Sequence, residues 1–498
     1  MSVATAIRPD EAGEVSPSEI RGFYPLVLDL DGTLLRTDLL LECALQFVRT
    51  RPLRVFLLLW WALHGIAYLK QQLAERAELA IDLLPVNEAL AAYAQTAADN
   101  GREVIIATAA NQLLAQHVCD RFDFAREALA STAELNLKGK RKAEALAARY
   151  PDGFVYAGDA AADLHVWRAA RFAIFAGDDA GVFKRVKALV PVEAHFQRER
   201  AGLTGWMKAL RVHQWAKNGL IFLPMMLAGV LLDLNAWLAC TLGFVAMGVT
   251  ASATYLLNDL MDLQEDRRHW SKRNRALASG TIGIPAATLA SIFLLGAGFG
   301  LAMLAGGLPT LALVLLYCAA TLTYSLYLKR VPLLDVTVLA GLFTLRLAVG
   351  AVIVDVRLSA WLMVFSMFLF FSLALAKRSI ELTRTISRGS AITAMHGRGY
   401  VPADAPFVST LGVSSALTAV AIMVLYLIHE AFPSALYSHP ELLWAAPVLI
   451  GLWLGRIWLL CTRGQLNDDP VQFTVHDRVS ILLGAGVMCS FAGAALLR

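Results

Sequence analysis

Charged residues are scarce in this sequence. Asp, Glu, Lys and Arg make up 17% of its 498 residues, whereas hydrophobic residues make up 57%. Soluble proteins usually carry about 25% charged and about 45–50% apolar residues. The scarcity excludes a disordered chain and a coiled coil, and it argues against an ordinary cytosolic enzyme. The 44 basic and 40 acidic residues leave a net charge of +4, too small to indicate a nucleic-acid partner.

Cysteines are also rare, and residues 1–20 show no secretory signal. The six cysteines include no C-x-x-C pair, which argues against zinc sites and dithiol redox motifs. Residues 1–20 are polar and acidic, without the basic start and apolar run of a secretory signal. We therefore expect the N-terminal part to stay in the cytoplasm.

The abundant apolar residues divide the chain unevenly. A polar tail at 1–21 precedes an expected soluble α/β domain at 22–195, and residues 196–217 form a linker with an interfacial segment. Residues 218–498 are mainly apolar and predict an all-α transmembrane bundle.

Polar side chains follow three predicted strands of the soluble domain. The strands at 26–30, 104–107 and 154–157 lead into Asp29-Leu30-Asp31-Gly32-Thr33, Thr108 and Gly158-Asp159 respectively. Strands separated by helical stretches predict a parallel, Rossmann-like sheet, in which functional groups lie at the carboxyl ends of strands.

An insertion at 34–100 follows the first strand and has a mostly helical pattern. Its most apolar part, residues 55–63, is too short to span a bilayer. Two interpretations stay open: a buried helix of a cap, or a helix that leans on the membrane surface.

The membrane half contains nine long apolar segments. They cover residues 218–233, 236–257, 286–305, 309–328, 331–353, 359–376, 409–430, 441–462 and 478–497. Basic residues concentrate in alternate loops, at 258–280, 329–330 and 377–398, and the positive-inside rule places these loops in the cytoplasm. The odd number of segments then places the C-terminus outside.

The loop after the second segment carries the pattern N-D-x-x-D-x-x-x-D. Asp259, Asp262 and Asp266 fall on one helical face, where mutual repulsion favours a bound divalent cation such as Mg²⁺, and Asn258 is a further candidate ligand. A solvated acidic helix end is the simpler alternative.

A basic run follows directly and contains Arg267, Lys272 and Arg275. Cations beside a metal-binding acidic face suit a diphosphate, so we predict that these residues bind substrate. Ordinary positive-inside bias would explain part of the same run.

These motifs resemble those of the UbiA superfamily of intramembrane prenyltransferases, over residues 205–498. The neighbouring segments R-V-H-Q-W-A-K-N at 211–218 and Y-S-L-Y-L-K at 324–329, with Asp335 and Arg346, resemble its decaprenyl-phosphate phosphoribosyltransferase branch. The resemblance implies that Asp259 and Asp262 act in catalysis over Mg²⁺.

One departure from the usual family pattern bears on the donor. Lys377-Arg378 stands where typical members carry a second acidic cluster. Fewer acids and more cations suit phosphoribosyl pyrophosphate as donor, with a polyprenyl phosphate as acceptor. The resemblance implies that Tyr324 binds substrate and that the cations Lys217, Lys329, Arg346 and Lys377 bind the 5-phosphate.

The N-terminal domain resembles the haloacid dehalogenase superfamily over residues 22–195. The resemblance implies a phosphatase whose nucleophile is Asp29, whose general acid and base is Asp31, and whose phosphate ligand is Thr108. Lys142 resembles the family's lysine, although Lys138 and Lys140 stay alternatives, and Asp159 with Asp163 forms the acidic pair. The implied Mg²⁺ ligands are Asp29, Asp31 and Asp159.

Fusion of the two domains predicts consecutive reactions on one lipid. Three alternatives remain: an aromatic or quinone prenyltransferase, a carrier or anchor with a regulatory domain, and a non-catalytic N-terminal domain. The oligomeric state also stays open, a homo-oligomer included.

Overall fold

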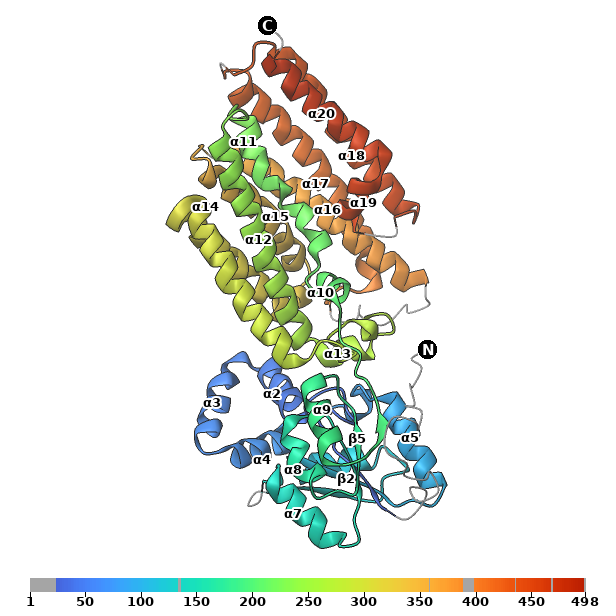
Figure 1. Cartoon of the computed structure of the whole chain (residues 1–498). Coiled ribbons are helices and arrows are strands. Elements are labelled where there is room, and N and C mark those ends of the chain that lie inside the picture. Colours follow the sequence, from blue (N-terminus) through green and yellow to red (C-terminus); the bar gives the residue numbers. More distant parts are fainter. Residues whose placement is uncertain are drawn as a thin grey trace. The chain divides into compact units, whose positions relative to one another are not determined.

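The computed structural model describes residues 24–132, 136–357, 359–387, 398–434, 436–466 and 469–496 (Figure 1). Contacts divide the chain into two compact units. The first contains Met1–Leu210 and Tyr255–Ala290, and the second contains Arg211–Thr254 and Ser291–Arg498. The loop that carries the N-D-x-x-D pattern therefore packs with the N-terminal domain.

A six-stranded parallel sheet, in the order β3-β2-β1-β4-β5-β6, forms the centre of the first unit. Its strands are β1 (Leu26–Leu28), β2 (Val104–Asn111), β3 (Ala128–Ser131), β4 (Val155–Gly158), β5 (Phe172–Phe175) and β6 (Val192–His195). The predicted parallel sheet is confirmed, and the three predicted strands correspond to β1, β2 and β4. Leu26 and Leu28 contact one core and Val27 the other, because successive side chains of a strand point to opposite faces.

Helices pack on both faces of the sheet and complete the two hydrophobic cores. The helices of this unit's α/β part are α2 (Leu39–Thr50), α3 (Val55–Leu63), α4 (Ile66–Arg76), α5 (Glu88–Asp99), α6 (Gln112–Cys119), α7 (Lys140–Arg149), α8 (Leu164–Trp167) and α9 (Ala180–Leu189), followed by α10 (Leu203–Ala209). Buried residues of α2, α4, α5 and α6 belong to the first core, and those of α7, α8 and α9 belong to the second. The predicted insertion after the first strand is helical and contributes α2, α3, α4 and α5.

The second unit consists of long apolar helices. Among the described residues, seven helices are long and apolar enough to cross a membrane. They are α12 (Leu234–Met261), α14 (Ile284–Leu326), α15 (Leu334–Ile353), α16 (Ala360–Ser387), α17 (Ala405–Tyr426), α18 (Ala445–Thr462) and α20 (Arg478–Leu496). Shorter helices of this unit are α11 (Leu223–Leu227) and α19 (Pro470–His476), whereas α13 (Leu263–Arg268) belongs to the first unit.

Helix α14 combines two of the predicted segments. A straight helix of 43 residues would be about 65 Å long, twice the hydrocarbon core of a bilayer. The backbone leaves helical geometry at Gly306 and Gly307, where Gly307 has φ +68°, and Pro309 follows. The kink therefore separates the two spans predicted at 286–305 and 309–328.

The first predicted segment, residues 218–233, is wrong as a continuous helix. The chain there forms a 3₁₀ helix at Val212–Phe222, the short α11, and a turn at Gly229 with φ +73°. Pro224 at the start of α11 lacks the backbone N–H that a continuing helix would need.

Buried charged residues join the segment 255–290 to the cap, which is the helical insertion at 34–100. Arg267 is 7% exposed and donates hydrogen bonds of 3.0 and 2.6 Å to the two carboxylate oxygens of Glu42 on α2. Its Nε donates to the Ala278 carbonyl at 3.1 Å, and Thr37 donates to Glu42 at 2.6 Å. A second ion pair joins Arg49 of α2 to Glu265. The acidic loop is thereby fixed to the α/β domain.

The Glu42–Arg267 pair gives a stability prediction. Arg267→Met leaves Glu42 buried without its counter-charge, which should destabilise this contact by about 3–5 kcal/mol. Hydrogen–deuterium exchange of the purified protein should show faster exchange in peptides of α2 and α13.

Two further variants test the cause. Arg268→Met, at an exposed neighbouring position, should leave exchange unchanged. Combining Glu42→Leu with Arg267→Met should restore most of the protection, because no buried charge remains unpaired. Unchanged exchange in Arg267→Met would show that the pair does not hold the loop.

Candidate functional site

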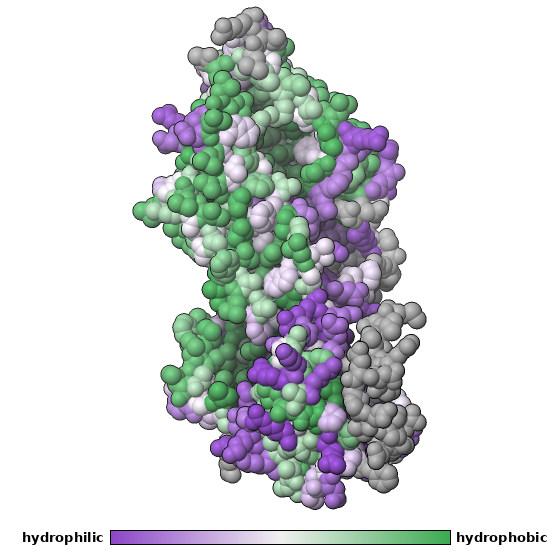
Figure 2. Space-filling view, viewed as in Figure 1, coloured by the Kyte–Doolittle hydropathy of each residue, from purple (hydrophilic) through white to green (hydrophobic). Residues whose placement is uncertain are grey.

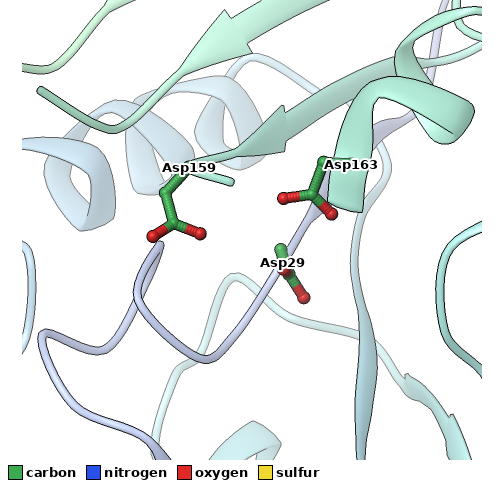
Figure 3. Close-up of side chains that lie close together, drawn as sticks. All are labelled: Asp29, Asp159 and Asp163. Carbon is green, nitrogen blue, oxygen red and sulfur yellow. The ribbon is translucent and has the colours of Figure 1, made fainter. Parts of the chain in front are cut away.

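Three carboxylates meet at the carboxyl end of the sheet (Figure 3). Asp29 follows β1, Asp159 follows β4, and Asp163 ends a 3₁₀ turn at Ala161–Asp163. Leu28 of β1 is in register with Ala157 of β4, so the residues that follow these strands lie side by side. One oxygen from each of the three carboxylates lies within 4.8 Å of the others. The topology thus assembles residues that are 134 positions apart in the sequence.

Lys142 is the cation of this cluster. Its Nζ donates to Asp29 Oδ1 at 2.8 Å and lies 3.9 Å from Asp163 Oδ1. Lys142 is 3% exposed, whereas Lys138 and Lys140 are exposed at the surface. The geometry therefore favours Lys142 among the three lysines.

Tyr156 is a member of the site that sequence reasoning missed. Its hydroxyl accepts a hydrogen bond from Lys142 at 3.0 Å and donates one to Asp163 at 2.8 Å. Tyr156 lies in the interior of β4 and looks like an ordinary core residue, because its apolar neighbours give no polar signal.

The residues after Asp29 form a tight turn over the cluster. Thr33 donates to Asp159 at 3.3 Å, and the Asp31 carboxylate accepts from the Leu39 amide at 2.9 Å. Gly32 has φ +80°, and a Cβ there would lie 2.5 Å from Asp159 Oδ2, so only glycine fits. Thr108 is fully buried in β2 and lines the same pocket.

Crowding raises the pKa values of these acids. Burial, with the charges of Asp38 and Asp29, raises the pKa of Asp31 to about 8. Burial, with Asp163 and Asp29, raises the pKa of Asp159 to about 7. A divalent cation offsets such repulsion, and Mg²⁺ prefers carboxylate oxygens. The donor set of Asp29, Asp159 and Asp163 therefore fits a Mg²⁺ ion, while the side chain of Asp31 is outside this set.

A pocket of about 540 Å³ opens above the carboxylates. Its polar part includes Asp29, Asp31, Lys142 and Asp159. Its opposite wall comes from the cap and from the start of α14. This wall includes Leu40, Leu41, Ile66, Lys70, Leu73, Gly283, Ile284 and Pro285. The volume suits a phosphate ester with an organic group attached.

A second acidic group lies at the end of α12. Asp259 and Asp266 are 4% and 3% exposed, and Asp262 lies between α12 and α13. The amide of Asp262 bonds to the Asn258 carbonyl, and that of Asp266 to the Asp262 carbonyl, so helical spacing continues through the break. Arg275 contacts both Asp259 and Asp266, but within the described residues the oxygens of Asp259, Asp262 and Asp266 do not all lie within 4.8 Å of one another. The metal site at these three acids therefore stays a prediction.

The predicted basic residues of this loop have different surroundings. Arg275 donates to Asp259 at 3.3 Å and to Asp266 at 2.6 Å, and Lys272 lies 3.7 Å from Asp266. These two cations therefore pair with the acids of the motif. The Arg267 guanidinium instead donates hydrogen bonds to Glu42 and to the Ala278 carbonyl. This position does not support the predicted role of Arg267 in substrate binding.

Three of the predicted phosphate-binding cations gather in the second unit. Lys217 and Lys377 lie 3.7 and 2.7 Å from the Asp469 carboxylate. The ring of Phe343 lies 5.7 Å from Lys217 Nζ and 5.4 Å from the Arg346 guanidinium. Burial alone would raise the pKa of Asp469, but Lys377 and Lys217 lower it to about 2. Asp469, which begins α19, was missed because its loop is far away in sequence.

Arg346 is held by neutral partners. Its Nε donates to Asn218 at 2.9 Å, its Nη2 donates to Tyr317 at 3.2 Å, and its Nη1 donates to the Leu342 carbonyl. Asn218 is 1% exposed, and its amide Nδ2 has no hydrogen-bond partner within the described structure. An anionic oxygen beside these cations would satisfy this buried donor.

The 3₁₀ segment can approach α15 because of Gly350. A Cβ at this position would lie 2.1 Å from the Ile221 carbonyl oxygen. Gly350 is one helical turn from Arg346, so the close approach brings Asn218 to the guanidinium.

The neighbouring cation Arg378 belongs to a separate buried network. It is fully buried, donates to Asp335 at 2.7 Å and pairs with Glu381. Tyr324, a predicted substrate ligand, lies 3.5 Å from Arg378, and Lys329 lies in a 3₁₀ turn at Leu328–Arg330. This network includes two acids that offset Arg378, so it differs from the Lys217–Arg346–Lys377 group.

Comparison with known proteins gives relatives of both parts. The uncharacterized protein y4nM of Sinorhizobium fredii is 40% identical over 477 residues, covering 94% of this chain and 90% of that protein. Decaprenyl-phosphate phosphoribosyltransferase of Mycobacterium tuberculosis is 30% identical over 290 residues, covering 56% of this chain and 91% of that protein.

A solved structure and a family model complete the comparison. A UbiA homologue from Archaeoglobus fulgidus bound to GPP and Mg²⁺ is 17% identical, covers 58% of this chain and 99% of its own, and has a TM-score of 0.44. The model of the UbiA prenyltransferase family matches residues 220–481, more than half of the chain. The chain belongs to the UbiA prenyltransferase family.

Proposed function

We propose that this protein is a bifunctional membrane enzyme. Its UbiA domain transfers 5-phosphoribosyl from phosphoribosyl pyrophosphate to a polyprenyl phosphate, such as decaprenyl phosphate. Its N-terminal domain then removes the 5-phosphate and leaves polyprenyl-phosphoryl-ribose. Two groups of residues in one chain carry the proposal. One is a group of cations suited to binding an anion, and the other is a group of carboxylates with a lysine that resembles a phosphatase site.

The cationic group in the second unit supports a donor with an additional phosphate. Lys217, Arg346 and Lys377 would bind the 5-phosphate, with the unpartnered amide of Asn218 as a further donor. An allylic diphosphate carries no such additional phosphate, so the aromatic or quinone prenyltransferase alternative gives these cations no separate phosphate to bind. The similarity to decaprenyl-phosphate phosphoribosyltransferase supports the same donor and acceptor.

The acids at the end of α12 would bind the diphosphate through Mg²⁺. Asp259, Asp262 and Asp266 would hold Mg²⁺, which would neutralise the departing diphosphate. Arg275 and Lys272 would bind its remaining oxygens. Departure of the diphosphate leaves an oxocarbenium ion on the ribose, and a polyprenyl phosphate oxygen forms the new C–O bond. An anionic phosphate is already nucleophilic, so no general base is required.

The α/β domain would act as a phosphatase of the haloacid dehalogenase kind. Asp29 would attack the phosphorus while the sugar oxygen leaves with a proton from Asp31. A carboxyl group with a pKa of about 8 keeps that proton at neutral pH. Water activated by Asp31 would then release phosphate from Asp29. Lys142 and Thr108 would orient the phosphoryl group, and Asp29, Asp159 and Asp163 would hold Mg²⁺.

Asp29→Asn tests the second reaction. The variant loses its nucleophile, so dephosphorylation should fall by about 10³-fold or more. Mass spectrometry of the lipid products should show polyprenyl-phosphoryl-5-phosphoribose accumulating at a normal rate. Asp152→Asn, at an exposed position of the same domain, serves as the control. An unchanged yield of dephosphorylated lipid from Asp29→Asn would show that the N-terminal domain does not act on the product of the transfer reaction.

Asp262→Asn tests the first reaction. Loss of one metal-binding carboxylate should lower phosphoribosyl transfer by about 10²-fold or more. Hydrolysis of p-nitrophenyl phosphate by the same sample should stay normal, because that reaction uses Asp29. Asp233→Asn, an exposed acid before α12, is the control. Full transfer activity in Asp262→Asn would show that this carboxylate does not hold a metal ion needed for the transfer.

Lys377→Met tests which donor the cationic group binds. Loss of one charged hydrogen bond to phosphate should raise the KM for phosphoribosyl pyrophosphate by roughly 10- to 100-fold. Arg456→Met removes a cation that pairs with Asp477 at 2.6 Å, and it should leave that KM unchanged. Transfer from geranylgeranyl diphosphate, with none from phosphoribosyl pyrophosphate, would establish the prenyltransferase alternative.

A further inference from the structure

The cap carries an apolar surface that the proposed reactions do not use. It is formed by α3, the residues before it and the start of α4, and we name it the cap hairpin surface. Its members are Leu53, Val55, Phe56, Leu57, Leu59, Trp60, Leu63, Ile66 and Tyr68, all exposed. Leu63 is 85% exposed and Leu53 is 79% exposed. Figure 2 shows this area as a continuous apolar region.

Only one side of α3 is used for packing within the cap. Trp61 is 5% exposed and contacts Phe47 of α2, with ring centroids 5.0 Å apart. Scattered exposed apolar residues are normal, but soluble proteins rarely expose a large contiguous group. The outward side of α3 therefore indicates a partner.

The charged residues of the hairpin sequence itself are all basic, and one of them, Arg49, pairs with Glu265. Residues 43–74 contain no Asp or Glu, whereas they contain Arg49, Arg51, Arg54 and Lys70. The Arg54 guanidinium lies 4.6 Å from the centre of the Phe47 ring, at the edge of the apolar surface. Apolar side chains bordered by cations match a bilayer with anionic headgroups. Nine residues of α3 extend about 14 Å, so the helix would lie in the interface and not span it.

The same hairpin reaches the phosphatase-like pocket. Ile66 is 59% exposed on the cap hairpin surface and also lines the pocket. Lys70 and Leu73 follow at helical spacing on one face of α4 and line the pocket as well. Lys70 Nζ donates to the Ala109 carbonyl at 2.5 Å, which fixes this face of α4 to the end of β2. One side of the hairpin is therefore exposed at the surface, and the other side lines the pocket that contains Asp29.

We propose that the cap hairpin surface docks on the lipid bilayer, so that a lipid-linked phosphate enters the pocket along α4. The substrate class rests on the proposed function, whereas the docking itself does not. The described part of the chain has seven helices able to cross a membrane, so the surface needs only weak affinity for lipid. This assigns to the cap a role in selecting membrane-bound over soluble phosphate esters.

Docking is tested by fluorescence of the full chain. Cys489 is the only exposed cysteine in the part of the chain that the structure describes, so Cys489→Ser provides a background for labelling. Phe56→Cys, labelled with an environment-sensitive fluorophore, is reconstituted in phosphatidylcholine–phosphatidylglycerol vesicles that contain lipids spin-labelled near the headgroup. The probe should lose most of its emission. Leu189→Cys, at an exposed apolar position on α9, is the matched control and should keep its emission.

The alternative outcomes are distinct. Equal emission loss at positions 56 and 189 would overturn the proposal. Energy transfer between probes at position 56 of two chains, without quenching by lipid, would assign the surface to a second copy of this chain.

A kinetic comparison tests the consequence. Leu59→Glu combined with Leu63→Glu places charges on the exposed side of α3, away from its buried contact. Dephosphorylation of the lipid-linked substrate should fall by about tenfold or more, whereas p-nitrophenyl phosphate hydrolysis stays unchanged. Equal effects on both substrates would overturn the entry route. If wild type dephosphorylates no lipid, the proposed function fails, and the quenching result still decides docking.

Discussion

Carboxylates held close together in a poorly hydrated site repel one another, and this structure offsets the repulsion with a cation that contacts two of them. Lys142 does so for Asp29 and Asp163, and Arg275 does so for Asp259 and Asp266. The same pairing holds Asp469 between Lys217 and Lys377. Removal of either partner would leave an uncompensated charge. Such sites are also those in which phosphate and Mg²⁺ bind well, because charges of both signs are already fixed in place.

The Glu42–Arg267 pair serves assembly, as does the pair of Arg49 with Glu265. It joins the cap of the α/β domain to the loop that carries the acidic motif. Thr37, which follows the Asp29–Thr33 turn, donates to the same Glu42 carboxylate. The phosphatase-like pocket, whose wall includes residues 283–285, and the acidic loop therefore belong to one compact unit. This arrangement favours consecutive chemistry on one substrate over two independent activities.

Local patterns in the sequence predicted much of this fold. Buried strands at 26–30, 104–107 and 154–157 needed only continuous apolar runs, and Asp29 and Asp159 followed from strand ends. Thr108 was expected at the end of the second strand, but β2 continues to Asn111. Most apolar segments became long helices, because about 20 such residues predict a span whatever surrounds them. The segment 218–233 did not, since Pro224 and Gly229 prevent one continuous helix.

Pairings between distant residues could not be predicted in this way. The basic run after Asp266 gave no sign that Arg267 faces Glu42, 225 positions earlier, while Arg275 faces the acids. Asp469 and Tyr156 likewise owe their place to tertiary packing. The family comparison fixes the chemistry class, and the side-chain geometry supports the finer proposal of two reactions on one lipid.

A doubly labelled donor tests that proposal most directly. Phosphoribosyl pyrophosphate with ¹⁴C in the ribose and ³²P in the 5-phosphate would be supplied, with polyprenyl phosphate, to the reconstituted wild-type protein. The account predicts that ¹⁴C enters the lipid fraction without ³²P, and that ³²P appears as inorganic phosphate in equal molar amount. Lipid that keeps both labels in equal amounts, or that takes up neither, would contradict it.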